Sequence, residues 1–467
     1  METIVAITTP AGTGGIAVIR LSGDNAFAIA DSVWKGKSLS SVPSHSAHLG
    51  EILASDGSTL DQAVATIYAA GHSFTGEPTV EFSIHGAQWL QREVLTRLVE
   101  AGARPAGPGE FSQRAVMNGR MDLAQAEGVA DLIAASSKAA HRLATRQMKG
   151  DFSRRFDVLR ERMIELASLL ELELDFSEED VEFADRSRLI ALCSEAKAEI
   201  DSLASSFRTG RALKDGVAVV IAGIPNAGKS TLLNRLLEDE KAIVSDIAGT
   251  TRDIIEDTAE IDGILYRFID TAGLREATDE VERIGIDRAE ARIRTADILL
   301  YLIDPTSPLP PQLDRFDDIR SRLSDATPTI LLCTKSDIRP EAINDLSALI
   351  PSSGTSIPAT DNAPQIISIS ARTGDGLGAL TSALKKLATA GHDPAAELII
   401  TNLRHYEALT AASAALSRTL EAMELGLSAD LIAQDLRESI HHLGLITGTI
   451  TTDTLLHSIF ARFCIGK

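Results

Sequence analysis

Residues 217–231 read VAVVIAGIPNAGKST, and this stretch decides the fold. Residues 217–222 form an apolar, mostly β-branched run, which is typical of a buried parallel strand. Gly223–Ser230 then fits the pattern GxxxxGK[ST], a glycine-rich loop between a strand and a helix. The glycines let backbone amides face phosphate groups, and Lys229 is expected to bridge the β- and γ-phosphates. The predicted phosphate-binding residues are Asn226, Ala227, Gly228, Lys229, Ser230 and Thr231, with the Ser230 hydroxyl on Mg²⁺.

Similar apolar runs recur at 298–303, 329–333 and 366–369, with helical stretches between them. The last expected helix lies near 377–387. Alternating strands and helices predict a doubly wound, Ras-like α/β domain over residues 215–389.

Two further loops fit the γ-phosphate side of such a domain. Asp270-Thr271-Ala272-Gly273 follows an apolar segment, so Asp270 is expected in the Mg²⁺ shell and the Gly273 amide on the γ-phosphate. The loop Ser245-Asp246-Ile247-Ala248-Gly249-Thr250-Thr251 supplies Thr251, which could close onto Mg²⁺.

Guanine specificity is predicted from Thr334-Lys335-Ser336-Asp337, which resembles the [NT]KxD motif. The Asp337 carboxylate would accept hydrogen bonds from guanine N1 and N2, a pairing that adenine does not offer. Thr334 stands where asparagine is commoner, so one contact is expected to be weaker. Ser370-Ala371 would supply a backbone amide to guanine O6. GTP is therefore the expected substrate.

The residue that orients water is less obvious, because Leu274 occupies the position after Asp-Thr-Ala-Gly where many small GTPases have glutamine. Glu282 is our candidate; the alternative is that its acidic stretch is only a solvated helix start. GTPases with asparagine at the position of Asn226 resemble those that use K⁺ beside the β–γ bridge, and such an ion would also need carbonyl groups of the loop 245–250. The alternative is that Asn226 simply caps the turn.

Composition limits the function classes. The 467 residues predict two to four domains, and the net charge of −21 with 4% aromatic residues argues against a broad nucleic-acid surface. Three widely spaced cysteines indicate neither a zinc site nor a disulfide framework, and Cys193 and Cys333 are expected to be buried. No signal peptide and no apolar run of about 18 residues is present, so a cytoplasmic protein is expected.

The remaining regions predict an α+β domain over 1–118 and helical segments over 119–214 and 390–467. One helical face is expected to carry Phe152, Phe156, Leu159, Met163, Leu166 and Leu170. We favour one helical domain with the α/β domain inserted into it over an independent C-terminal helical domain.

The whole chain resembles the MnmE (TrmE) family of tRNA-modification GTPases. Within the GTPase region the resemblance includes residues 249–253 and 270–282. Further segments outside that region carry it as well. They are residues 9–23, Ser73–Glu77, Pro108–Ala115, Asp122–Glu127, Asp131–Ile133 and the final Phe463–Lys467. None is required for GTP binding, so their joint presence is specific. Two departures are Arg120, where lysine is usual, and 105–108, which lacks the usual arginine.

The resemblance implies an N-terminal domain that dimerises and binds 5-formyltetrahydrofolate or a related one-carbon folate, with contacts at Arg20, Glu81, Arg120 and Lys467. It implies a homodimer whose GTPase domains pair in a K⁺-dependent manner. It makes Glu282 catalytic together with Lys229, and makes Asn226, Ser245, Ile247 and Thr250 K⁺ ligands.

The resemblance also implies a partner and a product. With an FAD-dependent protein (MnmG, also called GidA), such a GTPase adds an aminomethyl or carboxymethylaminomethyl group to C5 of the wobble uridine, U34, of certain tRNAs. Two other functions remain as alternatives. One is a ribosome-assembly factor whose binding is controlled by GTP, and the other is a folate-dependent transferase in which GTP hydrolysis only regulates the transfer. Cys464, in the terminal motif, fits either a nucleophile or a lid over the folate.

Overall fold

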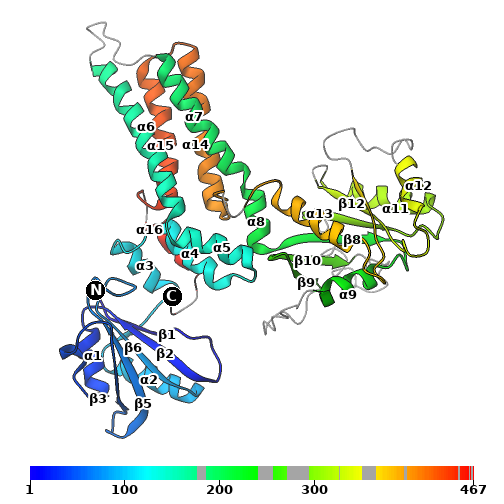
Figure 1. Ribbon diagram of the computed structural model, residues 1–467. Helices are drawn as coiled ribbons and strands as arrows, with labels where there is room; N and C mark the ends of the chain where they lie inside the picture. Colours follow the sequence, from blue (N-terminus) through cyan, green and yellow to red (C-terminus); the bar gives the residue numbers. More distant parts are fainter. Residues whose placement is uncertain are drawn as a thin grey trace, which may run out of the picture. The chain divides into compact units, whose positions relative to one another are not determined.

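The computed structural model describes residues 1–175, 186–239, 256–270, 294–324, 327–349, 364–393, 397–450 and 453–461, with Phe463 and Gly466. The chain divides into two compact units, whose helices and strands are labelled in Figure 1. Unit 1 comprises 1–130, 146–189 and 418–467, and unit 2 comprises 131–145 and 190–417.

Unit 1 contains a seven-stranded sheet in the order β3-β4-β5-β6-β2-β1-β7, with antiparallel neighbours except β1 and β7. The strands are β1 (Ile4–Ile7), β2 (Gly14–Ser22), β3 (Trp34–Lys35), β4 (Ser46–Leu53), β5 (Thr59–Tyr68), β6 (Thr79–Gly86) and β7 (Arg104–Pro105). Helices α1 (Ala26–Val33) and α2 (Gln88–Glu100) contribute to the same apolar core as the sheet, and the 3-10 helix η1 (Leu39–Ser41) adds Leu39. The expected α+β character of this region is confirmed.

The helices of unit 1 follow the sheet in sequence: α3 (Glu110–Met117), α4 (Leu123–Ala134, to residue 130), α6 (Asp151–Asp175), α15 (Ala429–Thr447) and α16 (Asp453–Phe460). α6 packs along α15. The six apolar residues predicted on one face of α6 are all buried, so that prediction is confirmed.

Unit 2 contains a six-stranded sheet in the order β13-β12-β11-β8-β10-β9, parallel except for the edge strand β9. Its strands are β8 (Val217–Gly223), β9 (Glu256–Ile261), β10 (Ile264–Asp270), β11 (Ile298–Ile303), β12 (Thr329–Cys333) and β13 (Gln365–Ser368). Its helices are α5 (Lys138–Met148, to residue 145), α7 (Arg186–Ser205, from residue 190), α8 (Phe207–Asp215), α9 (Lys229–Asp239), α11 (Pro310–Ser321), α12 (Ala342–Leu349), α13 (Leu377–Thr389) and α14 (Leu403–Glu424, to residue 417).

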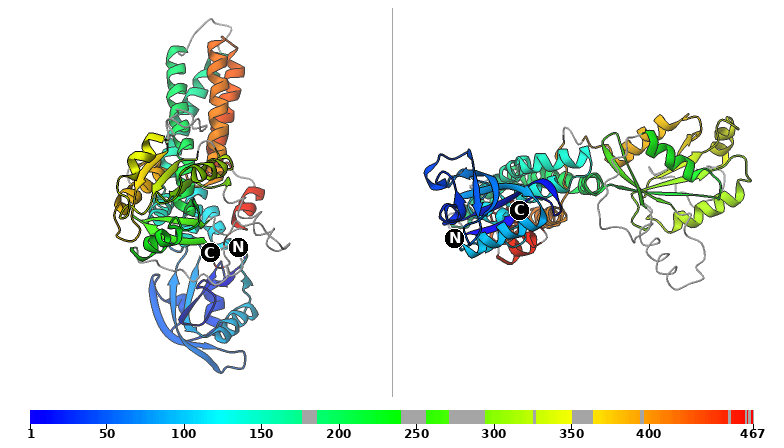
Figure 2. Two further views of the ribbon diagram at one scale, coloured as in Figure 1. Left: turned by 90° about the vertical axis from the view of Figure 1, so that its right-hand side faces the viewer. Right: turned by 90° about the horizontal axis from the view of Figure 1, so that it is seen from below.

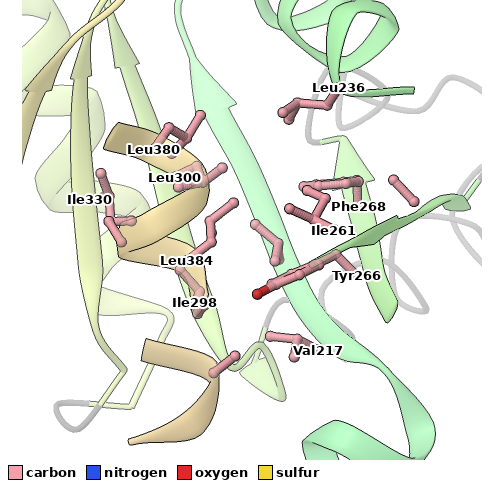
Figure 3. Close-up of a cluster of buried hydrophobic side chains, with 14 of the residues drawn as sticks. Val217, Leu236, Ile261, Tyr266, Phe268, Ile298, Leu300, Ile330, Leu380 and Leu384 are labelled. Atoms are coloured by element: carbon pink, nitrogen blue, oxygen red, sulfur yellow. The ribbon is translucent and has the colours of Figure 1, made fainter. Parts of the chain in front are cut away.

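Strand β8 lies in the middle of this sheet, and all seven of its residues are buried. Val217, Val219 and Ile221 join a core cluster with α8, α9 and α13 (Figure 3). The alternating residues, such as Val220, join a second cluster with residues of α11 and α12 on the other face. The right-hand view of Figure 2 shows helices on both faces of this sheet. Because both faces are covered by helices, the predicted doubly wound P-loop fold is confirmed.

Cys193 and Cys333 are buried as expected, and burial raises the pKa of the Cys193 thiol to about 11. None of the helices in the described residues is both long and apolar enough to cross a membrane.

Candidate functional site at the nucleotide-binding edge

The phosphate loop joins the end of β8 to the start of α9. Gly223 has φ 150°, and a Cβ there would come within 2.6 Å of the Leu302 carbonyl oxygen, so the close approach of β11 requires glycine. Gly228 has φ 97°, which also favours glycine. These two positions let the loop turn tightly before the helix begins.

Lys229 lies at the first position of α9, and its Nζ donates hydrogen bonds to the carbonyl oxygens of Gly223 and Ile224, both at 3.0 Å. The loop therefore curves around the ammonium group. Ser230 and Thr231 follow, with exposed side chains at the helix N-terminus, where backbone N–H groups favour anions. This arrangement fits a Mg²⁺-bound phosphate chain, with the Ser230 oxygen as a hard ligand.

Asn226 lies at the exposed tip of the loop with φ 62°. Asparagine tolerates the left-handed region better than most residues, so the turn alone accounts for it. Its amide oxygen also suits a hard cation, and the K⁺ role remains a prediction.

β10 carries Asp270 to the same edge of the sheet, because it pairs in parallel with β8, and Asp270 lies opposite Ile221. The other γ-phosphate residues lie outside the described part of the chain. They are Ser245, Asp246, Ile247, Ala248, Gly249, Thr250, Thr251, Thr271, Ala272, Gly273 and the catalytic candidate Glu282.

The guanine motif follows β12, at the carboxyl edge where β8 also ends. The Thr334 hydroxyl and backbone N–H both donate to the Ile303 carbonyl oxygen, at 3.1 and 2.9 Å. Thr334 is buried, so this side chain joins the ends of β11 and β12. It takes a structural role at the position where asparagine is commoner in the motif.

Asp337 and Ser370, which lie far apart in the sequence, meet at this edge. The Ser370 hydroxyl donates to Asp337 Oδ1 at 2.8 Å, and the Arg372 guanidinium lies 3.2 Å from Oδ2. Each carboxylate oxygen keeps acceptor capacity for a second donor. The structure thus brings together two of the predicted guanine contacts, with Ala371 next in the chain.

Asp304 was missed by sequence reasoning. It follows β11, and its Oδ2 lies 2.6 Å from Lys335 Nζ. Burial raises the pKa of Asp304, but hydrogen bonds from Lys335 and Thr306 outweigh burial and hold that pKa below its usual value. The ion pair fixes Lys335, which has φ 54°. An acidic residue directly after a parallel strand is the signal that could have identified it.

A second candidate site lies on the sheet of unit 1. Arg20 on β2 is opposite Glu81 on β6, and Arg20 Nε donates to Glu81 Oε1 at 2.8 Å. The Arg20 guanidinium also lies 5.3 Å from the centre of the Phe74 ring and 5.4 Å from that of Phe111. Two predicted folate contacts are therefore neighbours beside two aromatic rings.

The other two predicted folate contacts belong to nearby segments. A Cβ on Gly76 would come within 3.1 Å of Arg120 Cγ, so Arg120 packs on the loop that carries Phe74. Gly466 approaches Ile7 on β1 so closely that a Cβ would meet its carbonyl oxygen at 2.4 Å. Lys467 itself lies outside the described residues.

A buried ion pair anchors the loop that carries Phe74 and Gly76. Arg114 Nη1 donates to Glu77 Oε2 at 3.0 Å, and both side chains are less than 8% exposed. Ser22 Oγ donates to the same carboxylate at 2.9 Å. The segments 73–77 and 108–115, both part of the family resemblance, are thus joined by charge-assisted hydrogen bonds.

Comparisons with known proteins cover nearly the whole chain. The family description "GTP-binding protein TrmE N-terminus" matches residues 3–120, and "MnmE helical domain" matches residues 123–464. The tRNA modification GTPase MnmE of Cytophaga hutchinsonii is 47% identical over 466 residues, covering 100% of this chain and 98% of that protein. The protein of the same name from Parabacteroides distasonis is 46% identical, with 100% of both chains covered.

Among solved structures, the chain resembles Aquifex aeolicus Era Y63A bound to GDP and AlF4⁻. The identity is 28%, with a TM-score of 0.28, and the match covers 42% of this chain and 66% of that one.

Proposed function

The chain belongs to the MnmE (TrmE) family of tRNA-modification GTPases and is a GTP-hydrolysing enzyme, and from that premise we propose how it works. We propose a K⁺-dependent GTPase, activated by pairing of its GTPase domains in a homodimer. With an FAD-dependent partner it installs an aminomethyl or carboxymethylaminomethyl group on C5 of U34, using a one-carbon folate. The helical segments 119–214 and 390–467 form one domain into which 215–389 is inserted.

The observation that carries the proposal is the common edge on which Lys229 and Asp337 lie. Lys229 begins α9 directly after the phosphate loop, and Asp337 follows β12 beside Ser370. A guanine nucleotide bound there has its β- and γ-phosphates at Lys229 and its base at Asp337. Ser230 holds Mg²⁺, which neutralises charge that develops on the phosphates.

Catalysis then needs two further groups. Leu274 cannot orient water, so Glu282 takes this role, directly or through a second water. Asn226, with carbonyl groups of 245–250, holds K⁺ beside the β–γ bridge, where a fixed positive charge stabilises the transition state. The exposed loop tip at Asn226 is accessible to such an ion.

The Arg20 site supports the folate part of the proposal. A reduced folate presents the planar pyrimidine part of its pterin, an aromatic p-aminobenzoyl ring and carboxylates. The half-buried Phe74 offers an apolar ring face beside the Arg20 cation, and the fully buried Phe111 supports Arg20 from within the core. Glu81 orients Arg20 and can accept N–H donors of the pteridine ring.

The net charge of −21 fits a chain that leaves most tRNA binding to its partner protein. A phosphate-gripping surface would normally be basic, so the partner supplies most of the tRNA affinity. Tight, salt-sensitive tRNA binding by this chain alone would contradict this part of the proposal.

The first experiment compares steady-state GTP hydrolysis in KCl and NaCl at equal ionic strength. We expect strong stimulation by K⁺ that is lost in Asn226→Ala and kept in Asn234→Ala, an exposed asparagine in α9. Equal rates in both salts would remove the K⁺ mechanism and leave the GTPase assignment intact.

The second experiment reconstitutes the reaction with an FAD-dependent partner, formyltetrahydrofolate and tRNA, followed by nucleoside analysis. Arg20→Ala should abolish the modified uridine while GTP hydrolysis continues. Arg92→Ala, an exposed arginine of α2, is the matched control. Modification that proceeds normally in Arg20→Ala would exclude the folate role of this site.

A further inference from the structure

A cavity of about 470 Å³ lies in unit 2 at the edge of the sheet opposite to the phosphate loop. Its lining includes Val217 and Ile298, the first residues of β8 and β11, and Pro328, which precedes β12. The phosphate loop follows the other end of β8. The seven residues of β8 span six steps of about 3.3 Å, so the two sites lie roughly 20 Å apart. The cavity is therefore distinct from the nucleotide site.

Most of the buried residues that line the cavity are apolar, and Thr209 is the buried polar residue among them. Ala212 of α8 and Leu387 and Ala388 of α13 face it, together with Val217 and Ile298. Figure 3 places the last two at one end of the buried core. The volume falls within the usual range for pockets that hold small organic molecules, which are mainly apolar with a few polar groups.

The rim of the cavity is positively charged. Arg208 comes from the first turn of α8, and Lys386 from the last turn of α13. Both side chains are exposed, and neither forms an ion pair with any residue that the structure describes. His392 also lines the cavity, and its Nδ1 lies 2.6 Å from Oε2 of Glu397, so this ring nitrogen already has a partner.

Asp297 is the one acidic residue among the described residues of the lining, and it already has partners. Its Oδ2 accepts from the Ala218 N–H at 2.9 Å, and its Oδ1 is 3.6 Å from Arg211. The helix dipoles oppose each other here, because α8 begins and α13 ends at the cavity. The full charges of Arg208 and Lys386 therefore decide the local potential.

An apolar pocket with two unpaired cations is unusual in a chain with 66 acidic and 45 basic residues. We propose that this cavity binds a small organic anion with an apolar body, such as an aromatic carboxylate or sulfonate. The apolar body lies against α8 and α13, and the anionic group contacts Arg208 and Lys386.

The test uses 8-anilinonaphthalene-1-sulfonate as the probe, titrated by fluorescence and calorimetry into the full chain loaded with GDP and Mg²⁺. We expect one saturable site, with affinity lowered on the order of tenfold by Arg208→Ala and again by Lys386→Ala. Lys385→Ala is the matched control, because Lys385 is the neighbouring lysine, is absent from the lining and pairs with Asp262 at 3.3 Å.

Two further measurements test whether the anionic group is recognised and whether the variants remain folded. The neutral analogue N-phenyl-1-naphthylamine should bind much more weakly, since it lacks the sulfonate. Unchanged GTP hydrolysis and far-UV circular dichroism would show that the variants are folded. Probe binding that is absent, that is equal in Arg208→Ala and the native chain, or that is matched by the neutral analogue would overturn the proposal.

Discussion

The α-carbon of Gly210 faces the carbonyl group of Ile400 so closely that a Cβ on residue 210 would come within 2.0 Å of the Ile400 oxygen. One turn earlier in the chain, Ser206 Oγ accepts a hydrogen bond from the Ile400 N–H at 3.0 Å. The Phe207 and Tyr406 rings stack with centroids 4.6 Å apart. The segment before β8 and the segment after α13 are thus joined through α8.

Gly210→Ala is therefore expected to destabilise unit 2 by about 1–3 kcal/mol, because a backbone atom must move to admit the methyl group. The gain in helix propensity, about 1 kcal/mol, offsets only part of this. Urea unfolding followed by far-UV circular dichroism measures the change. Gly378→Ala in α13 is the control, since a Cβ there meets nothing within 4 Å. Equal midpoints for the two variants would contradict the close contact.

Asp337→Asn should lower GTP affinity on the order of ten- to a hundredfold, because it removes a charged acceptor for guanine N1 and N2. Binding of xanthosine triphosphate should improve, since the asparagine amide can donate to the 2-oxo group of xanthine. Competition against a fluorescent GDP analogue measures both affinities. An unchanged preference for GTP would mean that another residue recognises the base.

Arg114→Met should destabilise unit 1 by roughly 3–5 kcal/mol, because it leaves the buried Glu77 carboxylate without its partner. Fluorescence of Trp34 and Trp89, the two tryptophans of the chain, reports on unfolding of this unit. Arg104→Met is the control: Arg104 is 44% exposed and bonds to Glu2 and Glu110, so its loss should cost under about 1 kcal/mol. A similar loss in both variants would mean that burial of the Glu77 pair is unimportant.

The pair of Asp304 and Lys335 predicts an acid-sensitive contribution to stability. Since the pKa of Asp304 is lowered in the folded chain, the pair stabilises the fold above about pH 4 and loses this effect as pH falls through the lower, folded value. The difference in unfolding free energy between the native chain and Asp304→Asn should be constant from pH 5 to 8 and shrink below about pH 4. A difference that persists unchanged to pH 3 would argue against the ion pair.

The sequence predicts the fold best where a single local pattern is enough. The strands at 298–303 and 329–333 have the predicted bounds, because buried parallel strands are apolar on both faces. β4 and β9 were not predicted: β9 is an edge strand, and β4 is largely half-exposed, so neither has a continuous apolar run. β5 was not predicted either; its residues 63–68 alternate between buried and half-buried, but its first four residues are not buried. Tertiary pairing, not local sequence, defines these strands.

In the nucleotide site, too, local motifs were predictable and contacts that depend on tertiary pairing were not. The phosphate loop and the proximity of Asp337 to Ser370 follow from motifs, because each motif ends a strand of one parallel sheet. The bond between Asp304 and Lys335 depends on β11 and β12 being neighbours, which sequence order does not state. The approach of Gly466 to Ile7 joins opposite ends of the chain and has no local signal.

The core around the six-stranded sheet of unit 2 limits where the GTPase region can be cut out as a separate fragment. Leu143, Leu213 and Ile399 are buried in the same cluster as β8, although they lie outside residues 215–389. The Ala139 N–H also donates to the Gly263 carbonyl oxygen, in the turn between β9 and β10. A gene fragment cut at 215 and 389 would remove three apolar side chains, each contributing about 1.5–3 kcal/mol of burial. We therefore expect crystallisation and nucleotide-exchange studies of the isolated GTPase region to succeed only with fragments that retain these flanking segments.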